Sequence, residues 1–210
     1  MFLKKIWILI FTVLALFSLS SCELPSADDI NDSVEFPESY SITYQVKNKE
    51  GVIKTVIKTV DSEENVYFKS GKEELLFIKS SESYTEYKKD SDGAFVATED
   101  ISVDESYIEK ATEEIKEYAE QSKKQYIPGM KSRGEQELLG RNCKVFGIKL
   151  GGDSHNVSYS YYVDEETGIC FGFESDMLLA DNSVPTDDTM FTCIEFITKD
   201  IPSLKGMISE

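Results

Sequence analysis

Apolar and polar residues alternate with a period of two along much of this chain, and this pattern predicts β-strands. Gly51, Gly71 and Gly168 lie in short polar stretches between these runs, where a glycine suits a tight turn. The predicted strands cover residues 40–47, 52–60, 65–69, 74–80, 83–89, 143–150, 157–163, 169–174 and 190–199. Because the turns between them are short, neighbouring strands are expected to pair antiparallel.

Two of these strands raise the question of which face is buried. In residues 52–60, one face carries valines together with Lys54 and Lys58, and the other carries isoleucines and threonines. We expect the isoleucine–threonine face, which has no lysine, to be the buried one. Residues 75–78 (LLFI) are apolar on both faces, which predicts that this strand is covered on both sides.

A single amphipathic helix is predicted between the two groups of strands. Ser102 and Glu105 have the spacing of a capping box, and Pro128 with Gly129 would end the helix. Apolar residues recur at steps of three and four: Ile108, Ala111, Ile115, Tyr118, Ala119 and Tyr126. The predicted fold is therefore α+β and mainly antiparallel β, with a sheet covered by one long α-helix.

The N-terminus has the features of an export signal. Lys4 and Lys5 precede an apolar stretch, residues 6–19, that is too short to span a bilayer comfortably. Leu19-Ser20-Ser21-Cys22 resembles the lipobox of bacterial lipoproteins, which implies that Cys22 is acylated and becomes the new N-terminus. An ordinary secretory leader and an uncleaved anchor helix are the alternatives.

These features divide the chain into three parts. Residues 1–21 are interpreted as a lipoprotein signal peptide, residues 22–39 as an acidic flexible tether, and residues 40–210 as a single domain. The expected location is extracytoplasmic, anchored by lipid to the cell membrane, or to the outer membrane in a bacterium with two membranes.

The charge of the chain excludes some classes of partner. The formal net charge is −17, and the leader holds two lysines and no acid, so the mature chain is more negative still. Nucleic acid and anionic lipid surfaces both require a basic footprint, so neither is an expected partner. The acidity is typical of a soluble, self-repelling surface, and we expect a monomer.

Catalytic chemistry is not indicated by the sequence. His155 is the single histidine and lies in a turn of Gly, Asp and Ser, so neither a histidine-based catalytic triad nor a multi-histidine metal site is expected. Gly151-Gly152 follows a strand without opening a helix, unlike a phosphate-binding loop. Asp90–Gly93 lacks the further oxygen ligands of a calcium loop and is expected to form a hairpin tip. We therefore expect no enzyme activity, no metal and no cofactor.

Three cysteines remain after Cys22. Cys170 and Cys193 are expected on the outward face of neighbouring strands, where a disulfide between them is a candidate in an exported protein. Cys143 is predicted to lie one strand further away. Free, buried thiols are the alternative for all three.

A strand pair in the second half of the chain resembles a known family. Its residues are Leu139-Gly140-Arg141-Asn142-Cys143-Lys144-Val145-Phe146 and Tyr162-Val163-Asp164-Glu165-Glu166-Thr167-Gly168-Ile169. This pair is similar to one in the LolA/LolB-like lipoprotein-carrier superfamily of bacterial envelope proteins. The resemblance implies a curved half-barrel sheet, closed by helix, that binds lipid or acyl chains between the two layers.

The implied ligand cavity would be lined by aromatic and aliphatic residues of the second group of strands. The candidate lining residues are Phe146, Ile148, Tyr159, Tyr161, Phe171, Phe173, Ile194 and Phe196. The predicted function is a lipid-anchored envelope protein that binds a hydrophobic ligand. The alternative is a non-enzymatic interaction or sensor domain, in which the same residues form a filled core.

Overall fold

The computed structural model describes residues 33–48, 50–124, 130–152, 155–178 and 190–208. The helices and strands in chain order are β1 (Tyr40–Lys47), β2 (Ile53–Val60), β3 (Val66–Ser70), β4 (Glu73–Ser80), β5 (Ser83–Lys89), β6 (Phe95–Val103), α2 (Glu105–Ala111), α3 (Glu113–Ala119), α4 (Gln121–Lys124), β7 (Lys131–Leu138), β8 (Arg141–Gly152), β9 (His155–Asp164), β10 (Cys170–Leu178), β11 (Met190–Ile197) and the short 3₁₀ helix η2 (Leu204–Met207).

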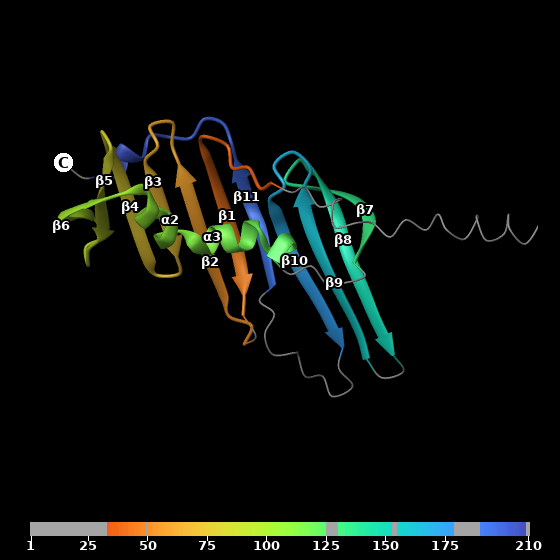
Figure 1. Cartoon of the computed structure of the whole chain (residues 1–210). Coiled ribbons are helices and arrows are strands. Elements are labelled where there is room, and N and C mark those ends of the chain that lie inside the picture. Colours follow the sequence, from red (N-terminus) through yellow and green to blue (C-terminus); the bar gives the residue numbers. More distant parts are fainter. Residues whose placement is uncertain (1–32, 49, 125–129, 153–154, 179–189, 209–210) are drawn as a thin grey trace, which may run out of the picture.

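The eleven strands in the described ranges belong to one open sheet in the order β6-β5-β4-β3-β2-β1-β11-β10-β9-β8-β7. Every neighbouring pair is antiparallel, and the pairing of β1 with β11 joins the first group of strands to the second. The helices cross one face of this sheet (Figure 1). The predicted open antiparallel sheet with helical cover is therefore confirmed, and each of the nine predicted strands has a counterpart.

The two strands that the periodicity did not predict are the two edges of the sheet, β6 and β7. Seven of the eight residues of β7 are exposed, so no apolar alternation marks it in the sequence. An edge strand has one paired side and needs little apolar surface. Its charged side chains also protect the open edge from pairing with other chains.

The prediction of one long helix is wrong. Three short helices, α2, α3 and α4, occupy this stretch, and the breaks fall at Thr112 and Glu120. Thr112 has φ −111° and ψ 13°, and its hydroxyl donates to the carbonyl of Ile108, a local bond that bends helices. The N-cap is Asp104, whose carboxylate accepts from the amide of Tyr107, while the expected cap Ser102 belongs to β6.

The predicted buried face of β2 is also wrong. Val56 is fully buried and lies on the lysine face, whereas Ile53 is exposed. Lys54 can face the helices because a carboxylate meets it. Glu114 of α3 accepts from Lys54 and from Ser70, the latter at 2.7 Å. An ion pair across the interface thus allows a face with charges to become the covered one.

The sheet has a smaller apolar cluster on its other face, beneath the C-terminal segment. Leu76, Phe95 and Leu204 form it, whereas Leu75 and Phe77 belong to the main core under the helices. The prediction that both faces of residues 75–78 are covered is confirmed.

The buried carboxylate of Asp61 attaches this C-terminal segment to the sheet. It accepts from the amides of Glu63, Asn65 and Leu204, the last at 2.8 Å. Burial alone would raise the pKa of Asp61, but these bonds outweigh it and hold the pKa below its usual value.

Part of the predicted tether packs on the domain. Val34 and Phe36 pack against the main core, Phe36 stacks on Tyr40 with ring centres 5.0 Å apart, and the amide of Glu35 donates to the carbonyl of Thr167 at 2.9 Å. The packed part of the chain therefore begins before residue 40. Residues 22–32 of the predicted tether, and the predicted signal peptide, lie outside the described residues.

Candidate functional site

The sheet has a fork between β10 and β11. In the described part of the chain these strands pair at two positions, Gly172 with Thr192 and Phe173 with Phe191. Beyond Phe173, β10 stays paired with β9 as far as Leu178, while β11 stays paired with β1 from its first residue. The two halves of the sheet separate here and leave a gap in an otherwise continuous surface.

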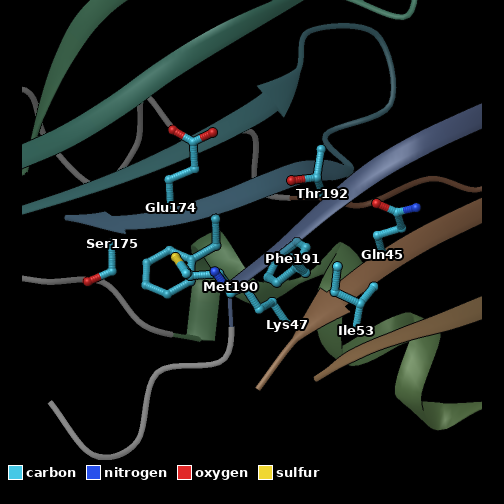
Figure 2. A pocket seen from close by; sticks show the side chains of 9 residues that line it. Gln45, Lys47, Ile53, Glu174, Ser175, Met190, Phe191 and Thr192 are labelled. Atoms are coloured by element: carbon cyan, nitrogen blue, oxygen red, sulfur yellow. The ribbon is translucent and has the colours of Figure 1, made fainter. Parts of the chain in front are cut away.

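An open pocket of about 450 Å³ occupies this fork (Figure 2). We call it the fork pocket, and its lining residues are Gln45, Lys47, Ile53, Phe173, Glu174, Ser175, Met190, Phe191 and Thr192. Four of these residues are apolar. The others supply one amide, two hydroxyls, one ammonium and one carboxylate. A few polar groups around apolar walls are typical of sites for small organic ligands.

The two charged residues that line the fork pocket, Lys47 and Glu174, are exposed. The carboxylate of Glu174 accepts from the Tyr162 hydroxyl at 2.9 Å, which holds it on β10. Lys47 is exposed at the end of β1. The pocket therefore offers an apolar wall next to polar groups of both signs, an arrangement that suits an amphiphile with a headgroup at the rim.

A continuous series of six aromatic rings leads from the helices to the fork and beyond it. We call it the aromatic row: Tyr44, Tyr118, Phe191, Phe173, Tyr161 and Tyr159. Tyr118 of α3 lies 5.0 Å from Phe191, which lies 6.3 Å from Phe173. Phe173 then stacks on Tyr161 at 4.8 Å and on Tyr159 at 6.0 Å. Phe173 and Phe191 belong both to this row and to the fork pocket.

Burial raises the pKa of two tyrosines of the row, Tyr44 and Tyr118. Desolvation raises the pKa of Tyr44 well above its usual value. The pKa of Tyr118 is also raised, by burial and by the hydrogen bond from its hydroxyl to Glu114. Their hydroxyls therefore stay protonated at physiological pH and act as hydrogen-bond donors. The Tyr44 hydroxyl donates to the carbonyl of Cys170 at 2.9 Å.

The predicted lining residues differ in how deeply the structure buries them. Phe146, Ile148, Tyr161, Phe171 and Phe173 are buried in the main core, and Tyr159 and Phe196 are partly buried against it. Among these, Phe173 also lines the fork pocket. The placement of Ile194 is wrong, because this side chain is 43% exposed.

The error at Ile194 comes from a β-bulge. Along β11, Cys193 pairs with Tyr44 and Glu195 pairs with Thr43, so Ile194 has no pairing partner on β1. The extra residue reverses the in–out order of the side chains on one side of the bulge. Cys193 is consequently buried, although the simple alternation predicted it outside.

The candidate disulfide between Cys170 and Cys193 is not present. Both are free, buried thiols, as is Cys143. A second bulge lies between Cys170 and Gly172, and Cys170 pairs with Val163 of β9 rather than facing Cys193. The Sγ atoms donate within their own strands, to the carbonyls of Gly172 and Glu195, each at 3.3 Å. Burial raises the pKa of both thiols to about 12, so they are unreactive.

The strand pair that resembles the lipoprotein-carrier family forms a structural ion pair. Arg141 donates to both oxygens of Asp164 at 2.8 Å and to Glu166 at 2.7 Å. Asp164 also accepts from the amide and hydroxyl of Thr167, at 3.0 and 2.6 Å. Arg141, Asp164 and Glu166 border a second, polar pocket of about 430 Å³. Since Arg141 is already paired with two carboxylates, this pocket has no free cation for a ligand at that position.

Gly140 and Gly168 supply the backbone turns at the ends of this pair. Both have positive φ, 72° and 70°, a conformation that glycine adopts without strain. The Arg, Asp, Thr and Gly residues that carry the resemblance therefore serve to fix a hairpin, and none of them lines the fork pocket.

Comparisons with known proteins give distant structural similarities. No family model matches the chain, and no curated protein matches it. Among solved structures, the chain is similar to MucB (TM-score 0.39, 15% identity, 88% of this chain and 64% of that one). It is also similar to the MucA/MucB complex of Pseudomonas aeruginosa, with a TM-score of 0.38 and 12% identity over 82% of this chain and 56% of that one. A third similar structure is LprF from Mycobacterium bovis, with a TM-score of 0.38 and 10% identity over 78% of this chain and 88% of that one.

The chain thus spans less than two thirds of the two MucB-containing structures that it matches. These similarities assign no ligand or partner to it.

The predicted acylation site, Cys22, lies outside the described residues. Within the described ranges, no helix has both the length and the apolar character needed to cross a membrane. In the same ranges, His, Cys, Asp and Glu side chains form no group of three or more suited to a metal ion.

Sequence reasoning missed most of the fork pocket. Gln45, Lys47 and Ile53 come from β1 and β2, Glu174 and Ser175 come from β10, and the remaining residues except Phe173 come from the start of β11. No local pattern marks them, because the pocket combines β10 and β11 with β1 and β2, which are far apart from them in the sequence.

Proposed function

We propose that this chain is a lipid-anchored, extracytoplasmic envelope protein whose single domain binds an amphiphilic ligand in the fork pocket. The observation that carries the proposal is the contact between an open pocket of about 450 Å³ and the buried aromatic row, through Phe173 and Phe191. Apolar walls beside polar rim groups suit a single acyl chain or a similar amphiphile. The proposal includes no catalytic step.

The ligand site in this proposal differs from the one expected from the sequence. Most predicted lining residues are buried in the core between sheet and helices, so they support the packing of the domain. That burial favours the second candidate function, an interaction or sensor domain with a filled core. The two candidates differ in whether the fork pocket takes up a small amphiphile.

Photo-crosslinking on the membrane-bound chain tests ligand binding. A dodecanoate that carries a diazirine on its chain is expected to label peptides that contain Ile53, Phe173, Met190 or Phe191. Ile53 lines the pocket and is 62% exposed, so Ile53→Glu should reduce labelling about tenfold without disturbing the core, because a carboxylate in the apolar wall repels the chain.

Val96→Glu is the matched control for this substitution. Val96 is also an exposed apolar strand residue, 52% exposed, but it lies on the edge strand β6 away from the fork. Its labelling should equal that of the wild-type chain. Labelling that is unchanged by Ile53→Glu, or that occurs only at other peptides, would support the filled-core alternative instead.

Cys22→Ser tests the lipid anchor. The substitution is expected to abolish incorporation of radiolabelled palmitate, because the thioether-forming sulfur is gone, and to release the mature protein from the membrane fraction. Ser21→Ala keeps a small residue before the cysteine and should remain acylated. A Cys22→Ser protein that still incorporates palmitate would refute the lipobox interpretation.

A further inference from the structure

A further pocket, of about 270 Å³, lies between the N-terminal segment, β2 and the helices. Its lining residues are Val34, Phe36, Lys58, Glu109, Thr112, Ile115, Lys116 and Glu120. We call it the lysine pocket. Val34, Phe36 and Ile115 give it apolar walls, and Phe36 is held in place by its stacking on Tyr40. The lysine pocket shares no residue with the fork pocket.

Lys58 differs from the other lysine on the same face of β2. The ammonium group of Lys54 is paired with Glu114, which also accepts from Ser70 and Tyr118. Lys58 is half-buried, yet within the described ranges it has neither a hydrogen bond nor an ion pair. Glu109 acts on Lys58 through its charge and makes no ion pair with it. A partly desolvated ammonium without a hydrogen-bond acceptor is costly, because it has lost water and gained no acceptor. A bound anion would supply that acceptor.

The charged residues around Lys58 determine its pKa and the net charge of the pocket. Desolvation lowers the pKa of Lys58, Glu109 raises it and Lys116 lowers it further, with a net fall from the usual value. Glu120 also lines the pocket and takes part in an interaction of its own. Because two lysines and two glutamates meet here, the pocket has no strong net charge. Affinity would therefore depend on direct contact with Lys58 rather than on long-range attraction.

We propose that the lysine pocket binds a small organic anion, a carboxylate with a compact apolar body. The carboxylate accepts from Lys58 Nζ, and the apolar body lies against Val34, Phe36 and Ile115. A charge-assisted hydrogen bond in a partly desolvated site distinguishes the anion from its neutral analogue. This site goes beyond the amphiphile site at the fork. Because Val34 and Phe36 belong to the segment that leads to Cys22, a ligand here also binds the domain to its own N-terminal segment.

Benzoate and benzamide test the proposal, since they have the same shape and differ in charge. Saturation-transfer difference NMR on the full chain in lipid nanodiscs should show binding of benzoate and at least about tenfold weaker binding of benzamide. Lys58→Met should weaken benzoate binding by about tenfold, and Lys58→Arg should preserve it. Raising the pH through the lowered pKa of Lys58 should release benzoate from the wild-type chain, because the ammonium loses its charge.

Lys54→Met is the matched control, because it removes a lysine from the same strand face that already has a partner. Its benzoate affinity should stay within about twofold of wild type, with circular dichroism confirming that each variant is folded. Equal binding of benzamide, unchanged binding by Lys58→Met, or no benzoate binding by the wild-type chain overturns the proposal. Dodecanoate labelling at the fork should be unchanged in Lys58→Met, so failure of one site is distinguishable from failure of the other.

Discussion

Replacing Asp164 with asparagine is expected to lower the free energy of unfolding by about 3 kcal/mol. Asp164 has 1% of its side chain exposed and accepts four hydrogen bonds, two from Arg141 and two from Thr167. Asparagine has the same shape but no charge, and its amide nitrogen places a donor where Arg141 or Thr167 also donates. The loss leaves a largely buried guanidinium without its main partner, which is the costly case for a buried ion pair.

The effect of this substitution should depend on pH. Burial alone would raise the pKa of Asp164, but the bonds from Arg141 and Thr167 outweigh it and hold the pKa below its usual value. A carboxylate with a lowered pKa in the folded state stabilises the protein above the unfolded pKa, about 3.9, and this contribution is lost as the pH falls through the folded pKa. The difference between wild type and Asp164→Asn should therefore shrink below about pH 4.

Urea unfolding followed by far-ultraviolet circular dichroism measures both effects. Glu166→Gln is the control, because Glu166 pairs with the same Arg141 at 2.7 Å but has 80% of its side chain exposed. Its cost should be under about 1 kcal/mol, as for exposed pairs. Equal losses for the two variants would show that burial of Asp164 does not determine the strength of the pair.

Tyr44→Ala is expected to destabilise the domain by about 4 kcal/mol. Tyr44 is fully buried and contacts two rings of the aromatic row, Tyr118 at 5.5 Å and Phe191 at 5.6 Å. Truncation leaves a cavity where α3 meets the central strands of the sheet. Because Tyr118 belongs to α3, the amides of that helix should also exchange with solvent faster, which hydrogen-exchange mass spectrometry measures.

Tyr44→Phe separates packing from hydrogen bonding. It keeps the ring and removes the hydroxyl that donates to Cys170, so it should cost about 1 kcal/mol and leave exchange in α3 nearly unchanged. If Tyr44→Ala were no more destabilising than Tyr44→Phe, the row would not be a packing element. The interpretation of its rings as core would then be wrong.

The strands of this fold could be predicted from local sequence because most of them are buried on one side. Alternation located β1 at residues 40–47 and β5 at residues 83–89 to the residue. It failed at β6 and β7, the two edges of the sheet, where solvent exposure removes the apolar signal. The helical stripe was also visible: Ile108, Ile115 and Ala119 are buried as expected. The breaks at Thr112 and Glu120 have no comparable signal in a pattern of hydrophobicity.

Which face a side chain occupies was harder to predict, because one extra residue reverses it. The bulges beside Cys193 and at Cys170 moved both cysteines inside and Ile194 outside. The burial of the lysine face of β2 depended on Glu114, more than fifty residues away in the chain. Neither effect is encoded within the strand concerned.

By itself, the sequence determined that this protein is a largely antiparallel β structure and strongly acidic in composition, since periodicity and composition are local properties. The export-type leader and the acylation at Cys22 stay predictions. Tertiary structure alone decided where a ligand has room. The fork pocket exists because β10 leaves β11 while β1 stays with it, and the lysine pocket exists because residues 34–36 pack over β2 beside the helices. Both depend on pairings between segments far apart in the chain, which no local pattern records.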